Sequence, residues 1–275
     1  MKKFLFKTTV IGFFFLFVFT LIGYGMKYCE WLTSISNASE VYESIFKSKR
    51  KCHANTLLIG DSVCGQLYAV SEYNGEIYSI PCSQATTLAG QFFLLNNFFK
   101  ANKKNLPNQV ILVYTPFSFQ NNLDHFAFNY LLKPFYNDEY ISLFDDNLKK
   151  QVTNIPFYYL TQFPFTKAVN FSPVYNGDLN KSKLLSPISE SYLIKIDSLC
   201  TRNNVKFVLK PTPVKKSYFS EVQKLEIDSN SKAYRIVSKY KEQIQYLPDT
   251  IFADNVHFKK EYIPKDYFKL VNNYN

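Results

Sequence analysis

The chain has 275 residues and a formal net charge of +10, and it is 47% hydrophobic and 18% aromatic. This much apolar surface excludes a disordered chain and is sufficient for one large domain. The positive charge suits nucleic acid or an anionic membrane or glycan surface, but the lysines are scattered and no zinc-finger or RNA-binding signature occurs. We therefore expect no nucleic acid partner.

The N-terminus carries a candidate membrane span. Residues 8–26 contain no charged side chain and are about long enough to cross the hydrocarbon core of a bilayer. Lysines precede this run, so the positive-inside rule places residues 1–7 in the cytoplasm and the bulk of the chain outside it. A cleavable signal peptide is the alternative, but its apolar region is usually shorter and ends at small residues. Because Tyr24 and Lys27 stand there instead, we expect a retained single-pass anchor.

Residues 27–53 are largely polar and end in a basic cluster. We interpret them as a polar helix and linker that spaces the remaining domain, residues 54–275, from the membrane. Within that domain, apolar runs that end at Gly or Pro predict strands, and apolar residues at three-to-four spacing predict helices. The predicted strands cover 56–59, 77–80, 109–114 and 205–210, and the clearest helices cover 86–100 and 188–200. Such alternation predicts an α/β fold with a mostly parallel sheet.

Residues 120–185 fit this alternation poorly, because they are rich in Phe, Tyr, Asn and Pro. We interpret them as an aromatic-rich insertion. Aromatic side chains in such density are more often part of a core than of a ligand groove. Since loops beside strand ends shape many α/β sites, a lid or a glycan-binding wall is the alternative.

The first candidate for chemistry is Gly60-Asp61-Ser62, which follows the first predicted strand. A serine in that position projects from the carboxyl edge of the sheet, and its N–H lies at a helix start, where negative charge is favoured. These properties suit a nucleophile that must stabilise an oxyanion. The same tripeptide is also ordinary turn and helix-cap chemistry. Cys64 is a possible thiol nucleophile nearby, for which packing is the simpler interpretation.

The second candidate is Asp254-Asn-Val-His257, near the end of the chain. A three-residue step lets the carboxylate reach the imidazole and fix its tautomer, while the other ring nitrogen faces a hydroxyl nucleophile. The alternative is a solvated Asp/His loop without a role. His53 and His125 have no such partner in the sequence, so we assign them exposed or packing roles. The five cysteines show no metal or disulfide spacing, and we expect neither a metal nor an organic cofactor.

Together these two motifs resemble the SGNH (GDSL-like) hydrolase superfamily, whose first block carries Gly-Asp-Ser and whose last block carries Asp-x-x-His. The resemblance implies a three-layer α/β fold with a mostly parallel sheet, here preceded by one N-terminal transmembrane helix. It also implies acyl-ester chemistry with a Ser-His-Asp triad. Ser62 would attack the ester, His257 would take and return the proton, and Asp254 would orient His257.

The middle blocks of the family pattern are altered in this chain. They normally supply a glycine N–H and an asparagine side chain to the oxyanion hole, but neither Gly nor Gly-x-Asn follows the second or third predicted strand. We assign the oxyanion hole to the N–H groups of Ser62 and Ser83 and to Asn121, with Asn122 as an alternative to Asn121. A missing donor costs roughly 10²–10³ in rate, so turnover is expected to be slow or specialised.

These departures and the single N-terminal span are similar to the divergent branch that contains alginate O-acetylation and teichoic-acid D-alanyl transfer proteins. That resemblance implies an extracytoplasmic acyltransferase or esterase that acts on a cell-envelope glycan. It also implies an acylated glycan or acyl donor, the membrane, and a membrane-bound O-acyltransferase as partners. One alternative is a catalytically silent SGNH-like domain that binds a glycan or a membrane partner. Another is an envelope protein in which the two motifs co-occur by accident.

Overall fold

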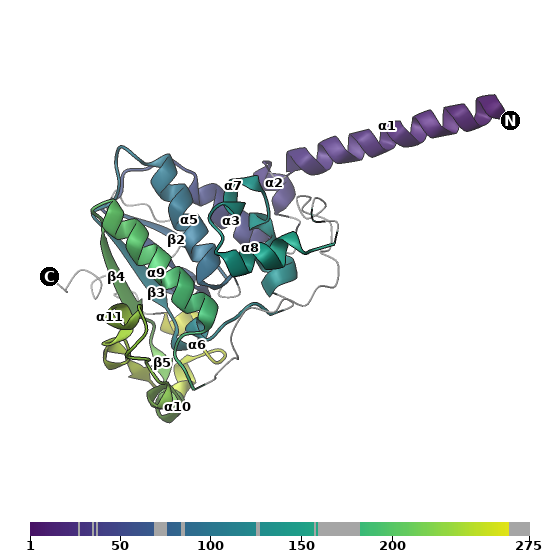
Figure 1. The fold of residues 1–275 in the computed structure, drawn as a ribbon. Helices are drawn as coiled ribbons and strands as arrows, with labels where there is room; N and C mark the ends of the chain where they lie inside the picture. Colours follow the sequence, from purple (N-terminus) through teal and green to yellow (C-terminus); the bar gives the residue numbers. More distant parts are fainter. Residues whose placement is uncertain are drawn as a thin grey trace.

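A parallel four-stranded sheet lies at the centre of the fold (Figure 1). The computed structural model describes residues 1–26, 28–34, 36, 38–68, 76–83, 86–124, 127–156, 158 and 182–263. The strands run in the order β2-β1-β3-β4, and their bounds are Thr56–Gly60 (β1), Ile77–Pro81 (β2), Gln109–Tyr114 (β3) and Lys206–Pro211 (β4). All three pairings are parallel. The predicted α/β class with a parallel sheet is therefore confirmed.

The sheet is covered on both faces, which explains why its strands are apolar runs rather than alternating ones. In β1, Leu57, Leu58 and Ile59 are all fully buried. Leu57 and Ile59 belong to the cluster on one face, and Leu58 belongs to a second cluster on the other face. The strand order also changes direction at β1, because the chain leaves β1 for β2 on one side and then crosses to β3 on the other. Parallel sheets bind ligands at such a switch point, at the carboxyl ends of the strands.

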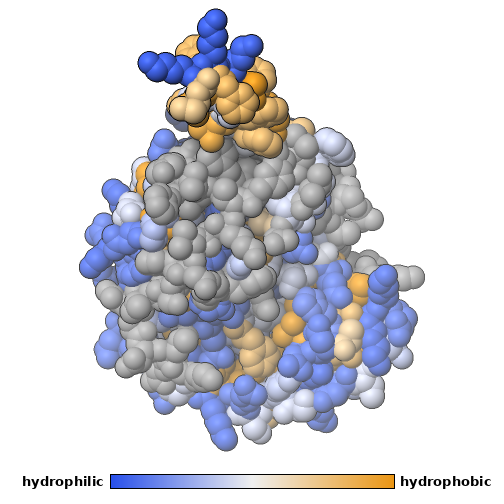
Figure 2. Space-filling model, turned by 90° about the vertical axis from the view of Figure 1, so that its right-hand side faces the viewer, coloured by the Kyte–Doolittle hydropathy of each residue, from blue (hydrophilic) through white to orange (hydrophobic). Residues whose placement is uncertain are grey.

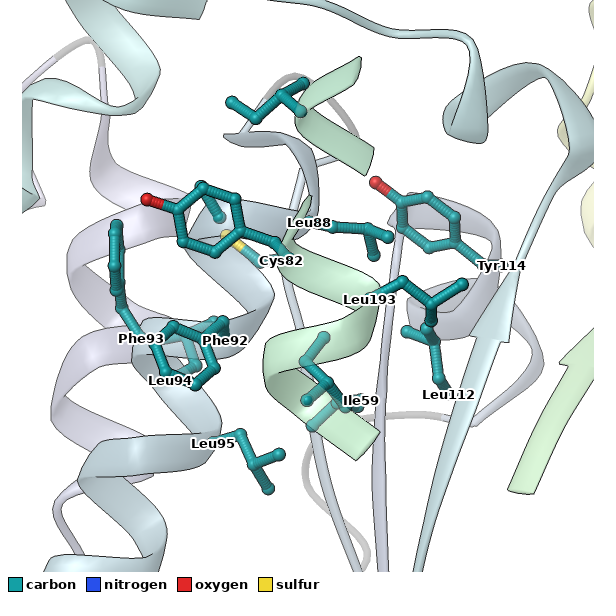
Figure 3. Packing of buried hydrophobic residues seen from close by; sticks show 14 of the residues in the cluster. Ile59, Cys82, Leu88, Phe92, Phe93, Leu94, Leu95, Leu112, Tyr114 and Leu193 are labelled. Atoms are coloured by element: carbon teal, nitrogen blue, oxygen red, sulfur yellow. The ribbon is translucent and has the colours of Figure 1, made fainter. Parts of the chain in front are cut away.

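Three helices pack on the first face, namely α3 (Ser39–Ser48), α5 (Thr87–Ala101) and α9 (Pro187–Arg202). Helix α9 begins where the Ser186 hydroxyl accepts a bond from the Ser189 N–H and Pro187 occupies the first turn, a position that proline favours. Figure 3 shows side chains of α5, among them Leu88 and Phe92, close to Ile59, Leu112 and Leu193. This layer is the larger of the two hydrophobic clusters.

Helix α3 corrects the predicted linker over 27–53. Its apolar side chains at Val41, Tyr42 and Ile45 are buried in the main core. Its polar groups also bond to the domain, since the Ser44 hydroxyl donates to the Pro81 carbonyl at 2.7 Å. The Tyr78 hydroxyl donates to the Lys47 carbonyl at 2.9 Å. The spacing of these apolar residues is that of a helix face, so residues 39–48 are part of the domain and not a spacer.

The opposite face carries a smaller layer. It consists of α4 (Ser62–Leu67) and a segment close to the C-terminus, where Phe252 and Phe258 form an antiparallel bridge. Both rings are buried and stack with centroids 4.8 Å apart. They pack with Leu58, Val63 and other apolar residues in the second cluster. This layer holds residues 252–258 against β1 and α4.

The described part of the aromatic insertion joins the main core. Its short helices are η2 (Ala127–Leu131), η3 (Lys133–Phe135), α7 (Asp138–Ile141) and α8 (Asp146–Thr153). The rings of Phe135, Tyr140 and Phe144 surround Phe93 of α5 with centroid distances of 5.1, 5.8 and 5.2 Å. These aromatic residues therefore extend the core. Residues 125–126, 157 and 159–181 of the predicted insertion lie outside the described residues.

The remaining elements are short and lie mostly after β4. Strands β5 (Val214–Lys215) and β6 (Tyr246–Leu247) form a second, two-stranded parallel sheet. Such brief strands carry no periodic pattern from which they could be predicted. The other elements are α2 (Glu30–Thr33), α6 (Pro116–Phe119), η5 (Lys216–Tyr218), α10 (Phe219–Lys224), α11 (Tyr234–Val237), η6 (Lys241–Gln243), η7 (Asp249–Ile251) and η8 (Lys260–Tyr262).

Helix α1 (Lys2–Met26) projects away from the rest of the chain (Figure 1). Figure 2 shows hydrophobic side chains around this helix and hydrophilic ones at its tip. Its segment Lys2–Gly23 is long and apolar enough to cross a membrane, and its most apolar stretch is not buried against the rest of the protein. An N-terminal helix of this kind is consistent with a signal anchor or with a signal sequence.

Position 60 has room only for glycine, because the backbone of β3 lies very close to it. A Cβ at this position would lie 2.0 Å from the Val113 carbonyl oxygen and 2.7 Å from the Cys64 Cβ. We expect Gly60→Ala to lower the free energy of unfolding by about 3 kcal/mol, because strand β3 cannot move without breaking the sheet. Gly65→Ala is the matched control in α4, since its Cβ would meet only the Pro81 side chain at 3.3 Å. Equal denaturation midpoints for the two variants would contradict this account.

Candidate active site

Ser62 stands at the carboxyl end of β1, as the first residue of α4. The turn between them is made by Asp61, which has extended backbone angles and caps the helix. Its Oδ1 accepts the N–H groups of Val63 at 3.1 Å and Cys64 at 3.3 Å. The Ser62 N–H, which is the first of the helix, is not bound by this carboxylate. Both predicted features of the tripeptide therefore coexist, since Asp61 is a cap and Ser62 projects from the sheet edge.

The chain brings Ser62, His257 and Asp254 together in a hydrogen-bonded row. The Nε2 of His257 lies 2.8 Å from the Ser62 Oγ, and its Nδ1 lies 2.8 Å from the Asp254 Oδ2. These distances are those of direct hydrogen bonds. A hydroxyl, an imidazole and a carboxylate in this order have the arrangement of a Ser-His-Asp triad. The two sequence motifs, far apart along the chain, therefore meet in direct contact.

Asp254 is held in the orientation that His257 requires. Its Oδ1 accepts the N–H groups of Val256 at 2.9 Å and His257 at 2.8 Å, which leaves Oδ2 for the ring. Burial alone would raise the pKa of Asp254, but the hydrogen bonds from the His257 and Val256 N–H groups and from the His257 ring lower it to about 2. The carboxylate is therefore ionised at neutral pH and can stabilise a protonated imidazole.

Asp61 is a second carboxylate near the serine, but it is fully buried and its hydrogen bonds hold neighbouring elements of the fold together. Its Oδ2 accepts the Thr115 N–H at 2.8 Å and the Ser118 hydroxyl at 2.7 Å. Burial raises the pKa of Asp61, while the bonds from Ser118, Thr115, Cys64 and Val63 act in the opposite direction. One side chain thus joins the ends of β1 and β3 to the start of α4.

A cavity of about 190 Å³ opens beside the serine. One wall comes from the sheet edge and α4 and contains Ser62, Gly65, Pro81, Cys82 and Ser83. Ser83, a predicted oxyanion donor, therefore borders the same cavity as Ser62. Another wall comes from α3 and contains Glu40, Glu43, Ser44 and Lys47, of which Glu43 and Lys47 form an ion pair. The predicted linker thus contributes four of the nine lining residues.

The structure does not bring Asn121, the third predicted oxyanion residue, to this cavity. Asn121 follows α6, where its N–H donates to the Ser118 carbonyl at 3.2 Å and its carbonyl accepts the Ser186 hydroxyl at 2.7 Å. Those bonds direct the chain toward the start of α9. The polar groups that follow β3 more closely, at Thr115 and Ser118, are bound by Asp61. Where the SGNH pattern would have Gly-x-Asn, this chain thus has polar residues, Thr115 and Ser118, that bind the buried Asp61 carboxylate.

The other candidate residues lie apart from this chemistry. Cys64 is fully buried, and burial and the Asp61 carboxylate raise the pKa of its thiol well above the usual value, so it packs as a neutral side chain. His53 precedes β1 in an exposed position, and His125 lies outside the described residues. Among the residues that the structure describes, no group of His, Cys, Asp or Glu could hold a metal ion.

Two contributions to the site had no motif in the sequence. One is the α3 wall of the cavity, for which the apolar stripe at Val41, Tyr42 and Ile45 was the available signal. The other is Gln66, whose amide bonds to the backbone of Phe258, the residue after His257. A single glutamine in a helix gives no indication of a partner so distant in sequence.

The fold and the row of three side chains define a class, namely α/β proteins with a hydrogen-bonded Ser-His-Asp row at the carboxyl end of a parallel sheet. No protein-family model matches the chain, and no curated protein matches it significantly. Functional assignment therefore depends on the residues and their geometry.

Proposed function

We propose that the chain is an extracytoplasmic serine-dependent O-acyltransferase or esterase of the SGNH type, acting on a cell-envelope glycan. The observation that carries this proposal is the Ser62–His257–Asp254 row, with both contacts at 2.8 Å. The order of the side chains along a parallel sheet and the late position of the Asp/His pair agree with the SGNH resemblance. The layers of helices on both faces agree with its three-layer fold.

The reaction follows from the positions of the three side chains. The Ser62 Oγ attacks the ester carbonyl carbon while His257 Nε2 takes the hydroxyl proton, and Asp254 stabilises the resulting imidazolium. The tetrahedral oxyanion is stabilised by the N–H groups of Ser62 and Ser83. Its collapse expels the alcohol, which takes the proton from His257. A sugar hydroxyl or water then attacks the acyl-enzyme, with His257 again acting as the base.

The dimensions of the cavity favour a short acyl group. Its volume of about 190 Å³ is smaller than the roughly 300–1,000 Å³ of sites for drug-sized ligands. Its accessible lining is mostly apolar, although it includes charged side chains of α3 and the hydroxyls of Ser62 and Ser83. A small, mainly apolar cavity beside the serine suits a short acyl group better than a long acyl chain.

The position of the site relative to α1 supports action beside a membrane. Helix α1 ends at Met26 and α3, which lines the cavity, begins at Ser39. If α1 is a retained anchor with its N-terminus in the cytoplasm, this short connection keeps the serine close to the outer face of the membrane. An acylated glycan or another acyl donor and a membrane-bound O-acyltransferase are the partners we propose.

A catalytically silent domain is the second candidate, because Asn121 lies away from the cavity and the family's glycine donor is absent. Such a domain would bind a glycan or a membrane partner without turnover. The two candidates differ in the reactivity of one hydroxyl.

Labelling with a fluorophosphonate separates these candidates. We expect the full-length protein to form a covalent adduct that peptide mass spectrometry locates at Ser62, because His257 activates that hydroxyl. Cys64→Ala is the control and should label at the wild-type rate, whereas Ser62→Ala should not label. Absence of an adduct on the folded wild-type protein would favour the silent domain.

A further inference from the structure

His257 lies in a hairpin whose internal bonds do not fix its distance from Ser62. The Ala253 N–H donates to the His257 carbonyl at 2.8 Å, and the Lys259 N–H donates to the Ile251 carbonyl at 2.9 Å. These bonds shape the hairpin itself. The side chains of Asp254 and His257 are 58% and 30% exposed, so surrounding protein constrains them only in part. Some other contact must set the hairpin against α4.

The side chain of Gln66 makes that contact. Its Nε2 donates to the Phe258 carbonyl at 2.9 Å, and its Oε1 accepts the Phe258 N–H at 2.8 Å. The amide therefore bonds to both polar backbone groups of the residue that follows His257. Gln66 lies one helical turn after Ser62 on α4, so this pair of bonds joins the helix that carries the proposed nucleophile to the hairpin that carries the proposed base.

We infer that Gln66 is a positioning residue that sets the Ser62–His257 distance in the proposed acyl-transfer reaction. The expected effect of Gln66 on the reaction rate rests on the proposed function. Its expected effect on the Ser62–His257 distance rests only on the two Gln66 bonds. The stacked rings of Phe252 and Phe258 attach the same hairpin to the second core cluster. Apolar contacts hold the hairpin near α4 but are not directional. The paired amide bonds, in contrast, fix the position of the hairpin along α4 and its orientation relative to that helix.

This role differs from a contribution to stability alone. Gln66 is only partly buried, but Phe258 is almost fully buried, so replacement of Gln66 leaves two backbone groups of Phe258 without their partner. Because the stacked rings of Phe252 and Phe258 still attach the hairpin to the second core cluster, the fold is expected to survive with a lower thermal midpoint. A displacement of about 1 Å between reacting groups can cost as much as 10²-fold in rate, so the effect should fall on the chemical step.

The test compares Gln66→Met, which keeps the length of the side chain and removes both bonds, with Gln223→Met, the same change at an exposed helix position. Gln66→Asn, which retains an amide too short to reach Phe258, is a second variant. Each is made in the full chain in detergent. We measure the fluorophosphonate labelling rate, the thermal midpoint, and the ¹⁵N spectrum of the histidine rings, with Ser62→Ala and His257→Ala spectra as references.

We expect both Gln66 variants to keep a cooperative transition and to label about 10- to 100-fold more slowly than wild type. Their His257 ring signals should move toward those of Ser62→Ala, while Gln223→Met stays unchanged. Wild-type labelling rates and ring signals in folded Gln66 variants would overturn the inference. If the wild type itself does not label, the proposed function fails, and the ring signals alone decide whether Gln66 sets the contact.

Discussion

His257→Ala is expected to reduce ester turnover by roughly 10⁴–10⁶-fold, as the removal of a triad histidine does in serine hydrolases. The reason is local, because the His257 Nε2 is 2.8 Å from the Ser62 Oγ and provides the base for that hydroxyl. Ser62→Ala should cause a loss of the same size, and the double variant should lose little more, since the two groups act as a unit. Turnover of a chromogenic short-chain ester and acylation of the envelope glycan in cells are the measurements.

The matched control is His53→Ala, which removes an imidazole at an exposed position before β1. It should retain wild-type turnover. Asp254→Asn should lower turnover by about 10⁴-fold, because it removes the charge that stabilises the imidazolium. Retention of glycan acylation in cells that carry His257→Ala would contradict the proposed mechanism.

Asp61→Ala is expected to lower the free energy of unfolding by on the order of 5 kcal/mol, the largest effect on stability that we predict. The substitution leaves four donors without their acceptor, namely the N–H groups of Val63, Cys64 and Thr115 and the hydroxyl of Ser118. Each buried donor that is left unpaired costs about 1–3 kcal/mol. Chemical denaturation with a probe of the core measures the change.

Asp145→Ala provides the comparison, because Asp145 also caps a helix, accepting the Leu148 N–H at 2.8 Å and the Ser191 hydroxyl at 2.8 Å, but is only partly buried. A cap of that kind contributes about 1 kcal/mol. Asp61→Asn should fall between wild type and Asp61→Ala, since an amide offers one oxygen where the carboxylate offers two. Equal losses for Asp61→Ala and Asp145→Ala would show that Asp61 is no more than a cap.

The strands of this fold were predictable because both faces of the sheet are covered. That burial requires continuous apolar runs, and the predicted strand at 109–114 has the bounds of β3. Helices α5 and α9 were predicted for a similar reason, since each presents an apolar stripe. The packing of α3 was missed because Val41, Tyr42 and Ile45 are few apolar residues in a largely polar segment that follows the apolar N-terminal helix. Strands β5 and β6 have two residues each and carry no pattern.

In the candidate site, too, residues that belong to a local sequence pattern were predictable and the others were not. Ser62, Asp254 and His257 were predictable because each belongs to a short motif, and the SGNH resemblance joined the two motifs in one site. Gln66 was not predictable, because its partner is a backbone group 192 positions away. Asn121 was assigned as a substitute for the missing Gly-x-Asn, although it is not at the expected distance after the strand. The bonds of Asp61 to Thr115 and Ser118 determine how the chain leaves that strand.

The contact between Ser62 and His257 joins positions 195 residues apart, and this separation has a consequence for biogenesis. The ribosome makes Ser62 long before His257, so a growing chain at first contains this hydroxyl without its proposed base. If the proposed triad acts as described, Ser62 is inert toward esters until residue 257 has been made. Reactivity would then begin only when the hairpin at residues 251–259 docks onto α4.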